Sequence, residues 1–207
     1  MKYYQEINAI KGTGINENVI LSDICGIIHN VLGLDDSINV GISFPKYSYN
    51  SRRDTSTLGC TMRVFANTKE ELEKLGLQSR LEALDDYINL SGIELVGDKA
   101  THYEVYTRCR QKNVQKKAEK LYNHYLKKHG EQKLVECFGD FQGVVEHCEK
   151  TNTKFKRLPF ITAVSNSNGE PYIIKLKRRP VDKPSRTFKF NNFGISVGSS
   201  PSTVPAW

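Results

Sequence analysis

The sequence predicts an α+β protein, because segments with strand character and segments with helical periodicity alternate irregularly along its 207 residues. In the first hundred residues the expected order is strand, helix, strand, strand, helix, strand. The four strands are expected at residues 2–10, 38–44, 60–66 and 90–96, where β-branched and aromatic residues lie between breakers. This order is the ferredoxin-like plan, an antiparallel sheet with both helices on one face.

The first helix is expected from about residue 18 to Gly33, with Asn16 or Asn18 as its cap. Its apolar positions repeat at the spacing of one buried helix face. These positions are Ile20, Ile24, Ile27, Ile28 and Val31.

The second helix is predicted to open with the capping box Thr68–Glu71. It restarts near Gln78 or Ser79 and is expected to continue to about residue 88. Its inward positions are Leu81, Leu84 and Ile88.

The second half also mixes strands and helices. A strand at 101–110 precedes a helix at 113–128, and residues 130–150 are expected to hold one short amphipathic helix and a loop. Strands follow at 158–165, 171–179 and 186–191, before a tail rich in Gly, Ser and Pro. We therefore expect a ferredoxin-like domain at 1–98 and a basic α+β domain at 99–207.

Charge separates the two halves. Residues 1–100 carry ten Lys and Arg against fourteen Asp and Glu, whereas residues 101–207 carry twenty against nine, which together give the net charge of +7. A strongly basic half predicts a polyanionic partner, and nucleic acid is the expected one. The sequence contains neither an apolar stretch of roughly 18 residues nor an N-terminal signal, so a cytoplasmic protein without a membrane segment is expected.

The helix at 113–128 carries much of this positive charge. Between residues 108 and 128 there are eight Lys and Arg and one acid, Glu119. Such a run is also typical of a solvated helix face. In a half that is already basic, we interpret it as a helix that follows phosphates. The cations Lys116, Lys120 and Lys127 lie opposite the apolar positions Val114, Ala118, Leu121 and Tyr125.

The distribution of carboxylates bears on the type of chemistry. Metal-assisted phosphodiester cleavage needs clustered carboxylates. The acids here concentrate in the first half, without a DxD or DExK pattern, so no metal ion and no cofactor are expected. RNA supplies its own nucleophile, the 2′-hydroxyl, and its cleavage requires a proton acceptor, for which histidine is suited by an ordinary pKa of roughly 6.5.

Two positions are candidates for this chemistry. His29 points away from the centre of the apolar face of the first helix, although a surface histidine without a role would have the same pattern. The turn from Ser165 to Gly169 places two hydroxyl groups between basic strands. A hairpin turn alone explains Asn168-Gly169 but not Ser165 and Ser167.

Several motifs occur in an order that resembles the type I-F CRISPR repeat endoribonucleases. The resemblance covers nearly the whole chain and rests on their joint order and spacing. The motifs are Val40-Gly41-Ile42-Ser43-Phe44-Pro45, the histidine inside the first helix, Arg-x-Arg at 108–110, Leu158-Pro159-Phe160 followed by Ser-x-Ser, and Phe-Gly-Ile-Ser at 193–196.

The resemblance implies an enzyme that cuts the CRISPR transcript 3′ of a repeat hairpin without metal, leaves a cyclic phosphate and stays bound to the product. The implied partners are the repeat RNA and other subunits of a type I-F surveillance complex. By motif position, His29 is the expected general base, and Ser165 holds the reacting nucleotide. The expected substrate-binding residues are Ser167, Arg108, Arg110, Lys112, Lys116, Lys120, Lys127, Tyr172 and Phe193.

Three departures from the family pattern bear on affinity, on the base that is read and on the rate. The helix expected in the RNA groove is lysine-rich rather than arginine-rich, which retains phosphate attraction but loses the fork geometry of Arg. Arg110 replaces an expected Gln, and Phe193 replaces a Tyr, so the hydroxyl of that Tyr is absent. Two alternatives to the enzyme are a subunit that binds an RNA hairpin without cutting it and, with less support, a DNA-binding factor.

Overall fold

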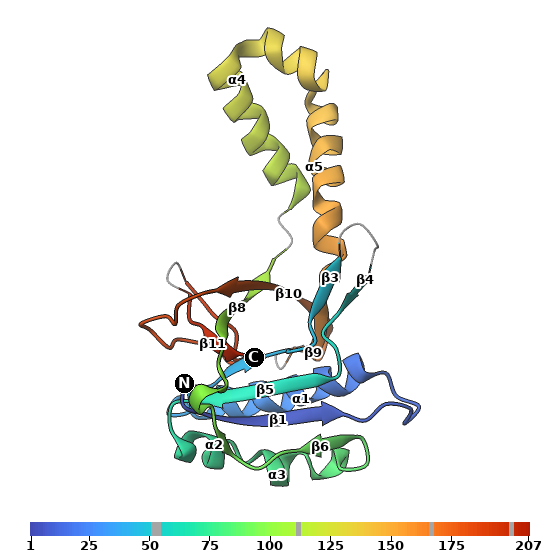
Figure 1. Cartoon of the computed structure of the whole chain (residues 1–207). Coiled ribbons are helices and arrows are strands. Elements are labelled where there is room, and N and C mark those ends of the chain that lie inside the picture. Colours follow the sequence, from blue (N-terminus) through green and yellow to red (C-terminus); the bar gives the residue numbers. More distant parts are fainter. Residues whose placement is uncertain (51–54, 111–112, 166–167, 199–200) are drawn as a thin grey trace. The chain divides into compact units, whose positions relative to one another are not determined.

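The computed structural model describes residues 1–50, 55–110, 113–165, 168–198 and 201–207, without the side chains of 152–156. These residues form two compact units (Figure 1). The first comprises residues 1–109 and 159–207, and the second comprises residues 110–158. Both helices and sheets are present, which confirms the predicted α+β class.

The first sheet is built from strands of the N-terminal hundred residues. Its order is β2 (Gly41–Ser43), β5 (Thr61–Ala66), β1 (Tyr3–Ala9) and β6 (Ile88–Leu90), and β7 (Glu94–Leu95) also pairs with β1. Every pairing is antiparallel. The strands β1, β2 and β5 fall within three of the predicted segments.

The helix α1 (Glu17–Leu34) begins at Asn16, whose side chain accepts a hydrogen bond from the backbone N–H of Asn18. It extends one residue past the expected end at Gly33, and Asp35 is its C-terminal cap. The predicted apolar positions Ile20, Ile24, Ile28 and Val31 are buried in the core, and Ile27 is half-buried against it. Helical periodicity therefore identified the buried face correctly.

The helix α2 (Lys69–Leu75) opens with the predicted capping box, in which Thr68 and Glu71 exchange hydrogen bonds. The expected helix to residue 88 is wrong. The short helix α3 (Leu77–Arg80) and the 3₁₀ turn η1 (Glu82–Leu84) come first, and Ile88 then lies in β6. Ile88 pairs with Ala9 of β1, so sheet hydrogen bonding outweighs the helical spacing of the leucines.

The polar loop expected between the second and third strands contains a two-stranded ribbon. The strand β3 (Ser48–Asn50) pairs with β4 (Thr55–Thr57), and residues 51–54 lie outside the described chain. The Tyr and Thr residues of these short segments favour extended backbone. The low hydrophobicity of this ribbon explains why the sequence suggested a loop.

The second sheet has the order β11 (Val204–Ala206), β8 (His102–Cys109), β10 (Pro171–Val181) and β9 (Phe160–Val164), all antiparallel. The 3₁₀ turn η2 (Gly97–Lys99) precedes β8. Both sheets contribute to one core of the first unit.

The predicted strand at 186–191 is wrong, and the C-terminal tail forms β11 instead. Residues 186–191 make one isolated bridge, between Phe190 and Ser196. Side chains hold this segment in place: the Ser202 hydroxyl accepts from the Lys189 N–H and donates to the Lys189 carbonyl. Val204 and Ala206 are buried against the core, which accounts for the strand in the tail.

The second unit is a pair of helices, α4 (Val114–Phe138) and α5 (Phe141–Lys156). The single short helix expected within 130–150 is wrong, because α4 continues past Gly130, where the backbone turns with φ 80° and ψ 169°, and α5 begins within the same segment. The non-helical connection between the two helices is short, at residues 139–140. Ala118, Val144 and Cys148 form the buried contact between the helices. Among the described residues, no helix combines the length and apolar character that crossing a bilayer requires.

In the first unit, Gly194 lies in the segment that follows β10 and packs closely against β2. Its φ is +64°. A Cβ there would lie 2.7 Å from Ile42 Cγ2. We expect Gly194→Ala to lower the free energy of unfolding by about 2–4 kcal/mol, from the left-handed conformation and the overlap together. Gly12→Ala is the matched control, because Gly12 has φ +81° with nothing within 4 Å of its Cβ position, so it should lose only about 1 kcal/mol. Urea denaturation measures both, and equal losses would contradict the predicted overlap.

Candidate functional site

His29 lies near the C-terminal end of α1 and is held by the segment 191–195 from the far end of the chain. Its Nδ1 is 3.3 Å from the carbonyl oxygen of Asn192. Its imidazole stacks on the ring of Phe193, with centroids 3.9 Å apart and planes 8° from parallel. The half-buried His29 is therefore fixed by one polar contact and one stacked face.

The segment 191–195 is itself held by short-range hydrogen bonds. The Asn191 side-chain oxygen accepts from the backbone N–H groups of Phe193 and Ile195, at 2.9 and 3.1 Å. The carbonyl oxygen of Gly194 accepts from the N–H of Ile42 in β2, at 2.9 Å. These bonds fix the Asn192 carbonyl and the Phe193 ring to the first sheet.

This arrangement determines which ring nitrogen of His29 is available. A carbonyl oxygen only accepts hydrogen bonds, so Nδ1 carries the ring hydrogen and donates a hydrogen bond to the Asn192 carbonyl. In the neutral imidazole, Nε2 then has the lone pair. The site can thus present Nε2 as a proton acceptor in a fixed orientation.

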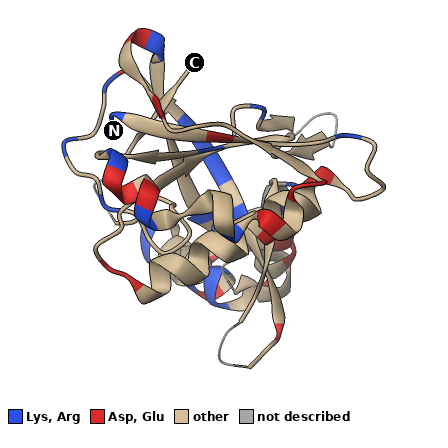
Figure 2. Ribbon diagram, turned by 90° about the horizontal axis from the view of Figure 1, so that it is seen from below, with Lys and Arg blue, Asp and Glu red and all other residues tan. Residues whose placement is uncertain are grey.

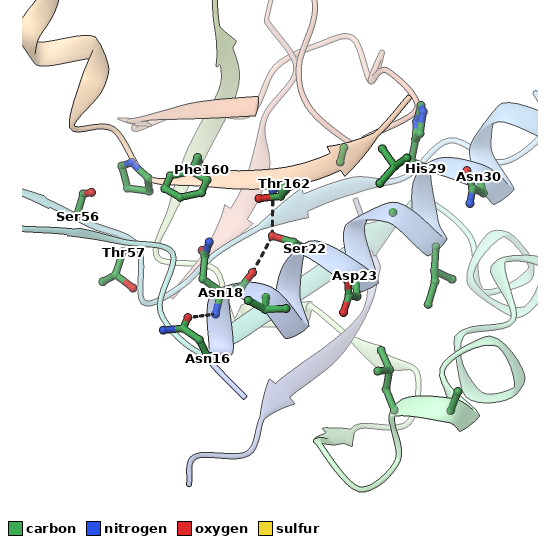
Figure 3. A pocket seen from close by; sticks show the side chains of 18 residues that line it. Asn16, Asn18, Ser22, Asp23, His29, Asn30, Ser56, Thr57, Phe160 and Thr162 are labelled. Carbon is green, nitrogen blue, oxygen red and sulfur yellow. Dashed lines mark hydrogen bonds between the residues drawn. The ribbon is translucent and has the colours of Figure 1, made fainter. Parts of the chain in front are cut away.

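An open cavity of about 1030 Å³ extends along α1 from His29 (Figure 3). One wall is α1, from Asn16 to Asn30, and another is β9. The rest of the lining consists of Ser56, Thr57, Ala83, Leu84 and Pro159. The cavity is large enough for a sizeable ligand and mixes amide, hydroxyl and apolar side chains.

The strand β9 is attached to α1 through Ser22. The Ser22 hydroxyl accepts from the N–H of Thr162 at 3.0 Å and donates to the Asn18 carbonyl at 2.7 Å. Figure 3 shows β9 running from Phe160 past Thr162 toward the end of α1 that carries His29. Val164, the last residue of β9, lines the same cavity as His29.

Ser165 follows β9 directly and begins the turn to β10. Its N–H donates to the Glu170 carbonyl at 2.9 Å, and its carbonyl accepts from the Gly169 N–H at 2.8 Å. The predicted site residue Ser167 lies outside the described residues. Ser165 therefore comes directly after Val164, the last residue of β9, which lines the cavity together with His29.

The structure also brings Arg108 and Tyr172 together. The exposed Arg108 of β8 has its guanidinium carbon 5.7 Å from the ring centroid of the half-buried Tyr172 of β10. A cation at this distance interacts favourably with the ring. Arg110 is exposed and belongs to the second unit, and Lys112 lies outside the described residues.

The lysines of α4 are arranged as the helical periodicity predicted. Lys116, Lys120 and Lys127 are exposed, and Ala118 is buried against α5. The helix begins at Asn113, whose side chain accepts from the N–H groups of two residues in the first turn. The three lysines therefore form a cationic face on one side of α4.

The charges of the first unit are unevenly distributed. Figure 2 distinguishes Lys and Arg from Asp and Glu in a view from the side of α2 and α3. The segment 69–86 that contains these helices carries six acids against three cations. On β10, Lys177 and Arg179 are exposed, whereas Arg178 turns inward, 3.2 Å from Glu104 and over the Tyr47 ring.

The residues that hold His29 were not predicted from the sequence. Asn191 shapes the loop, and the Asn192 carbonyl contacts His29 of α1, which is remote in sequence. No local sequence pattern connects this loop with α1. The only available signal was an Asn followed three residues later by a glycine, which is typical of a turn. Ser22, the link between α1 and β9, had no signal beyond its place beside the apolar face.

Fold and site together define a two-unit α+β protein in which a C-terminal loop orients a histidine at the end of a large cavity. The family model described as CRISPR-associated protein (Cas_Csy4) matches residues 4–207, so the chain belongs to this family. It is similar to the CRISPR-associated endonuclease Cas6/Csy4 of Pseudomonas aeruginosa (strain UCBPP-PA14), with 23% identity over 198 residues, covering 96% of this chain and 97% of the relative. The resemblance drawn from the sequence motifs is thereby confirmed.

The stacking of His29 on Phe193 predicts a spectroscopic signature. The ring current of Phe193 should shift the carbon-bound protons of the His29 ring upfield, and Phe193→Leu should reverse that shift. Proton NMR of the histidine ring signals measures this. His124 on α4 is exposed and provides the control, because its signals should not move. Identical His29 signals in both proteins would contradict the stacked geometry.

Proposed function

We propose that the chain is a metal-independent endoribonuclease that cleaves CRISPR precursor RNA at the 3′ foot of the repeat hairpin and remains bound to the product. The observation that carries this proposal is the orientation of His29, whose Nδ1–H is directed to the Asn192 carbonyl. Membership of the CRISPR-associated family and the similarity to a relative named as an endonuclease support the same function.

In the proposed reaction, Nε2 of His29 accepts the proton of a ribose 2′-hydroxyl. The 2′-oxygen then bonds to the adjacent phosphorus, the bond from phosphorus to the 5′-oxygen of the next nucleotide breaks, and that oxygen takes up a proton. The products are a 2′,3′-cyclic phosphate and a 5′-hydroxyl end. Ser165 would hold the reacting nucleotide by a hydrogen bond from its hydroxyl, and Ser167, the second serine of the same sequence motif, would also bind substrate.

Two kinds of contact with the hairpin are proposed, one to bases at the foot of the stem and one to phosphates along it. Tyr172 would stack under the last base pair, and Arg108 and Arg110 would read bases at the foot of the stem. Stacking and a bidentate arginine contact are each worth about 1–3 kcal/mol. Phosphates of the stem would be bound by cations on or before α4, namely Lys112, Lys116, Lys120 and Lys127.

The proposed roles of the two halves of the chain follow from their charge. Residues 1–98 would supply His29 on a ferredoxin-like domain, a plan that the strand order β2-β5-β1-β6 supports. Residues 99–207 would bind the RNA. Phe193 would act through His29, because its ring lies against the imidazole. Other subunits of a type I-F surveillance complex are the proposed protein partners.

Product retention follows from where these contacts lie. Stacking and phosphate contacts are to the stem, which cleavage leaves intact. The product should therefore dissociate slowly, and turnover should be limited by release. The alternative, a hairpin-binding subunit that does not cut, has no use for a histidine held in one orientation by a stacked ring and a carbonyl.

The general-base role predicts that His29→Ala binds the repeat hairpin as the parent does but cleaves it about 10²–10⁴-fold more slowly. Single-turnover cleavage of labelled repeat RNA in EDTA measures the rate, and filter binding measures affinity. His147→Ala is the control, because His147 is an exposed histidine of α5.

Two outcomes would contradict the proposed mechanism. One is parental cleavage by His29→Ala in the presence of chelator. The other is cleavage of a hairpin with 2′-deoxyribose at the scissile nucleotide, since that substrate lacks the attacking oxygen. Binding without cleavage by the parent protein would favour the non-cutting subunit.

The lysines of α4 predict a change in salt dependence. Replacing Lys116, Lys120 and Lys127 by Ala removes up to three phosphate contacts, so the slope of log affinity against log salt should fall by about two to three. Titration of the hairpin at several KCl concentrations measures the slope. A triple variant at Lys2, Lys69 and Lys74 is the control, with three exposed lysines of the first unit. Equal slopes for the two variants would contradict the role of α4.

A further inference from the structure

The second sheet has one face that is not part of the core. Ile161 and Ala163 of β9 and Ile174 and Leu176 of β10 are buried, so alternate residues of both strands point the other way. That opposite face carries exposed apolar side chains, with Phe160 36%, Val164 59% and Ile173 53% exposed. We refer to it as the outer face; it comprises Phe160, Thr162, Val164, Ile173, Lys175, Lys177 and Arg179.

Register places an aromatic ring beside a cation on this face. Phe160 pairs directly with Lys175, and Thr162 pairs with Ile173. Directly paired residues have their side chains on the same side of the sheet. The cation and the ring are in contact: Lys175 Nζ lies 5.7 Å from the centroid of the Phe160 ring. Lys177 and Arg179 continue the row of cations along β10.

The outer face is continuous with the cavity that contains His29. Phe160, Thr162 and Val164 line that cavity on the β9 side. From Phe160 to Val164 the strand spans about 13 Å, at roughly 3.3 Å per residue. Figure 3 shows the labelled residues Phe160 and Thr162 along this wall, with His29 at the far end.

An aromatic face, a row of cations and hydrogen-bonding side chains are the elements that bind unpaired nucleic acid. Bases stack on the ring, and the cations attract phosphates. The α1 wall of the cavity carries Asp23, which repels phosphates. Charge therefore favours a strand that follows β9 rather than α1.

We propose that the outer face binds the unpaired nucleotides immediately 3′ of the scissile phosphate, with Phe160 as the stacking platform and Lys175 as a phosphate contact. This inference rests on the proposed function. With cleavage at His29, the RNA that runs from His29 along β9 is the part of the transcript downstream of the cut. The hairpin with its tail is bound more tightly than the cleaved product, which has lost this contact.

The experiment compares hairpins of the CRISPR repeat that carry one or eight nucleotides 3′ of the scissile position. A 2′-deoxyribose at that position blocks cleavage, so affinity is measured without reaction. The parent protein should bind the eight-nucleotide tail about tenfold more tightly than the single nucleotide. In the double variant Phe160→Leu, Lys175→Ala, this ratio should fall to nearly one, with unchanged affinity for the single-nucleotide RNA.

Two further variants separate stacking from folding defects. Phe160→Tyr retains an aromatic face and should keep the parental ratio. Phe141→Leu, at a similarly exposed phenylalanine of α5, should also keep it. A ratio near one in the parent, or an unchanged ratio in the double variant, would overturn the inference and indicate a surface for another ligand, such as a protein subunit. Failure of the parent to cut the all-ribose hairpin would instead overturn the proposed function, which this binding ratio does not test.

Discussion

The orientation of His29 depends on the hydrogen bond between the Ile42 N–H and the Gly194 carbonyl. This bond joins the C-terminal loop to β2, and the loop in turn presents the Asn192 carbonyl and the Phe193 ring to the imidazole. Bringing segments so distant in sequence together costs loop-closure entropy, which the shared core of the first unit offsets. The candidate site is therefore a consequence of tertiary structure rather than of any local motif.

Those parts of the fold that depend on local interactions could be predicted from the sequence. The buried face of α1 follows from the spacing of its isoleucines, and the start of α2 follows from the capping box at Thr68. The exposed lysines of α4 follow from the same periodicity. His29 and Ser165 were candidates from the helix face and the turn, and the order of the motifs suggested their roles, which remain proposals.

Those parts that depend on distant partners could not be predicted. Ile88 has helical spacing with its neighbours but pairs with Ala9, and the tail at 204–206 becomes a strand only because β8 offers an edge. The same reason applies to Asn191, whose side chain organises a loop that matters only through its contact with α1. A single sequence contains no record of such pairings, because periodicity reports only one element at a time.

The second unit is inserted between two strands of one sheet. The chain leaves the sheet at Cys109 and returns at Pro159, while β8 and β9 both remain paired with β10. The inserted hairpin contributes no strand to this sheet, whose described pairings all lie within the first unit. The segment 191–195 that holds His29 lies outside this insertion, so a change in the length or surface charge of the hairpin need not alter the contacts of the imidazole.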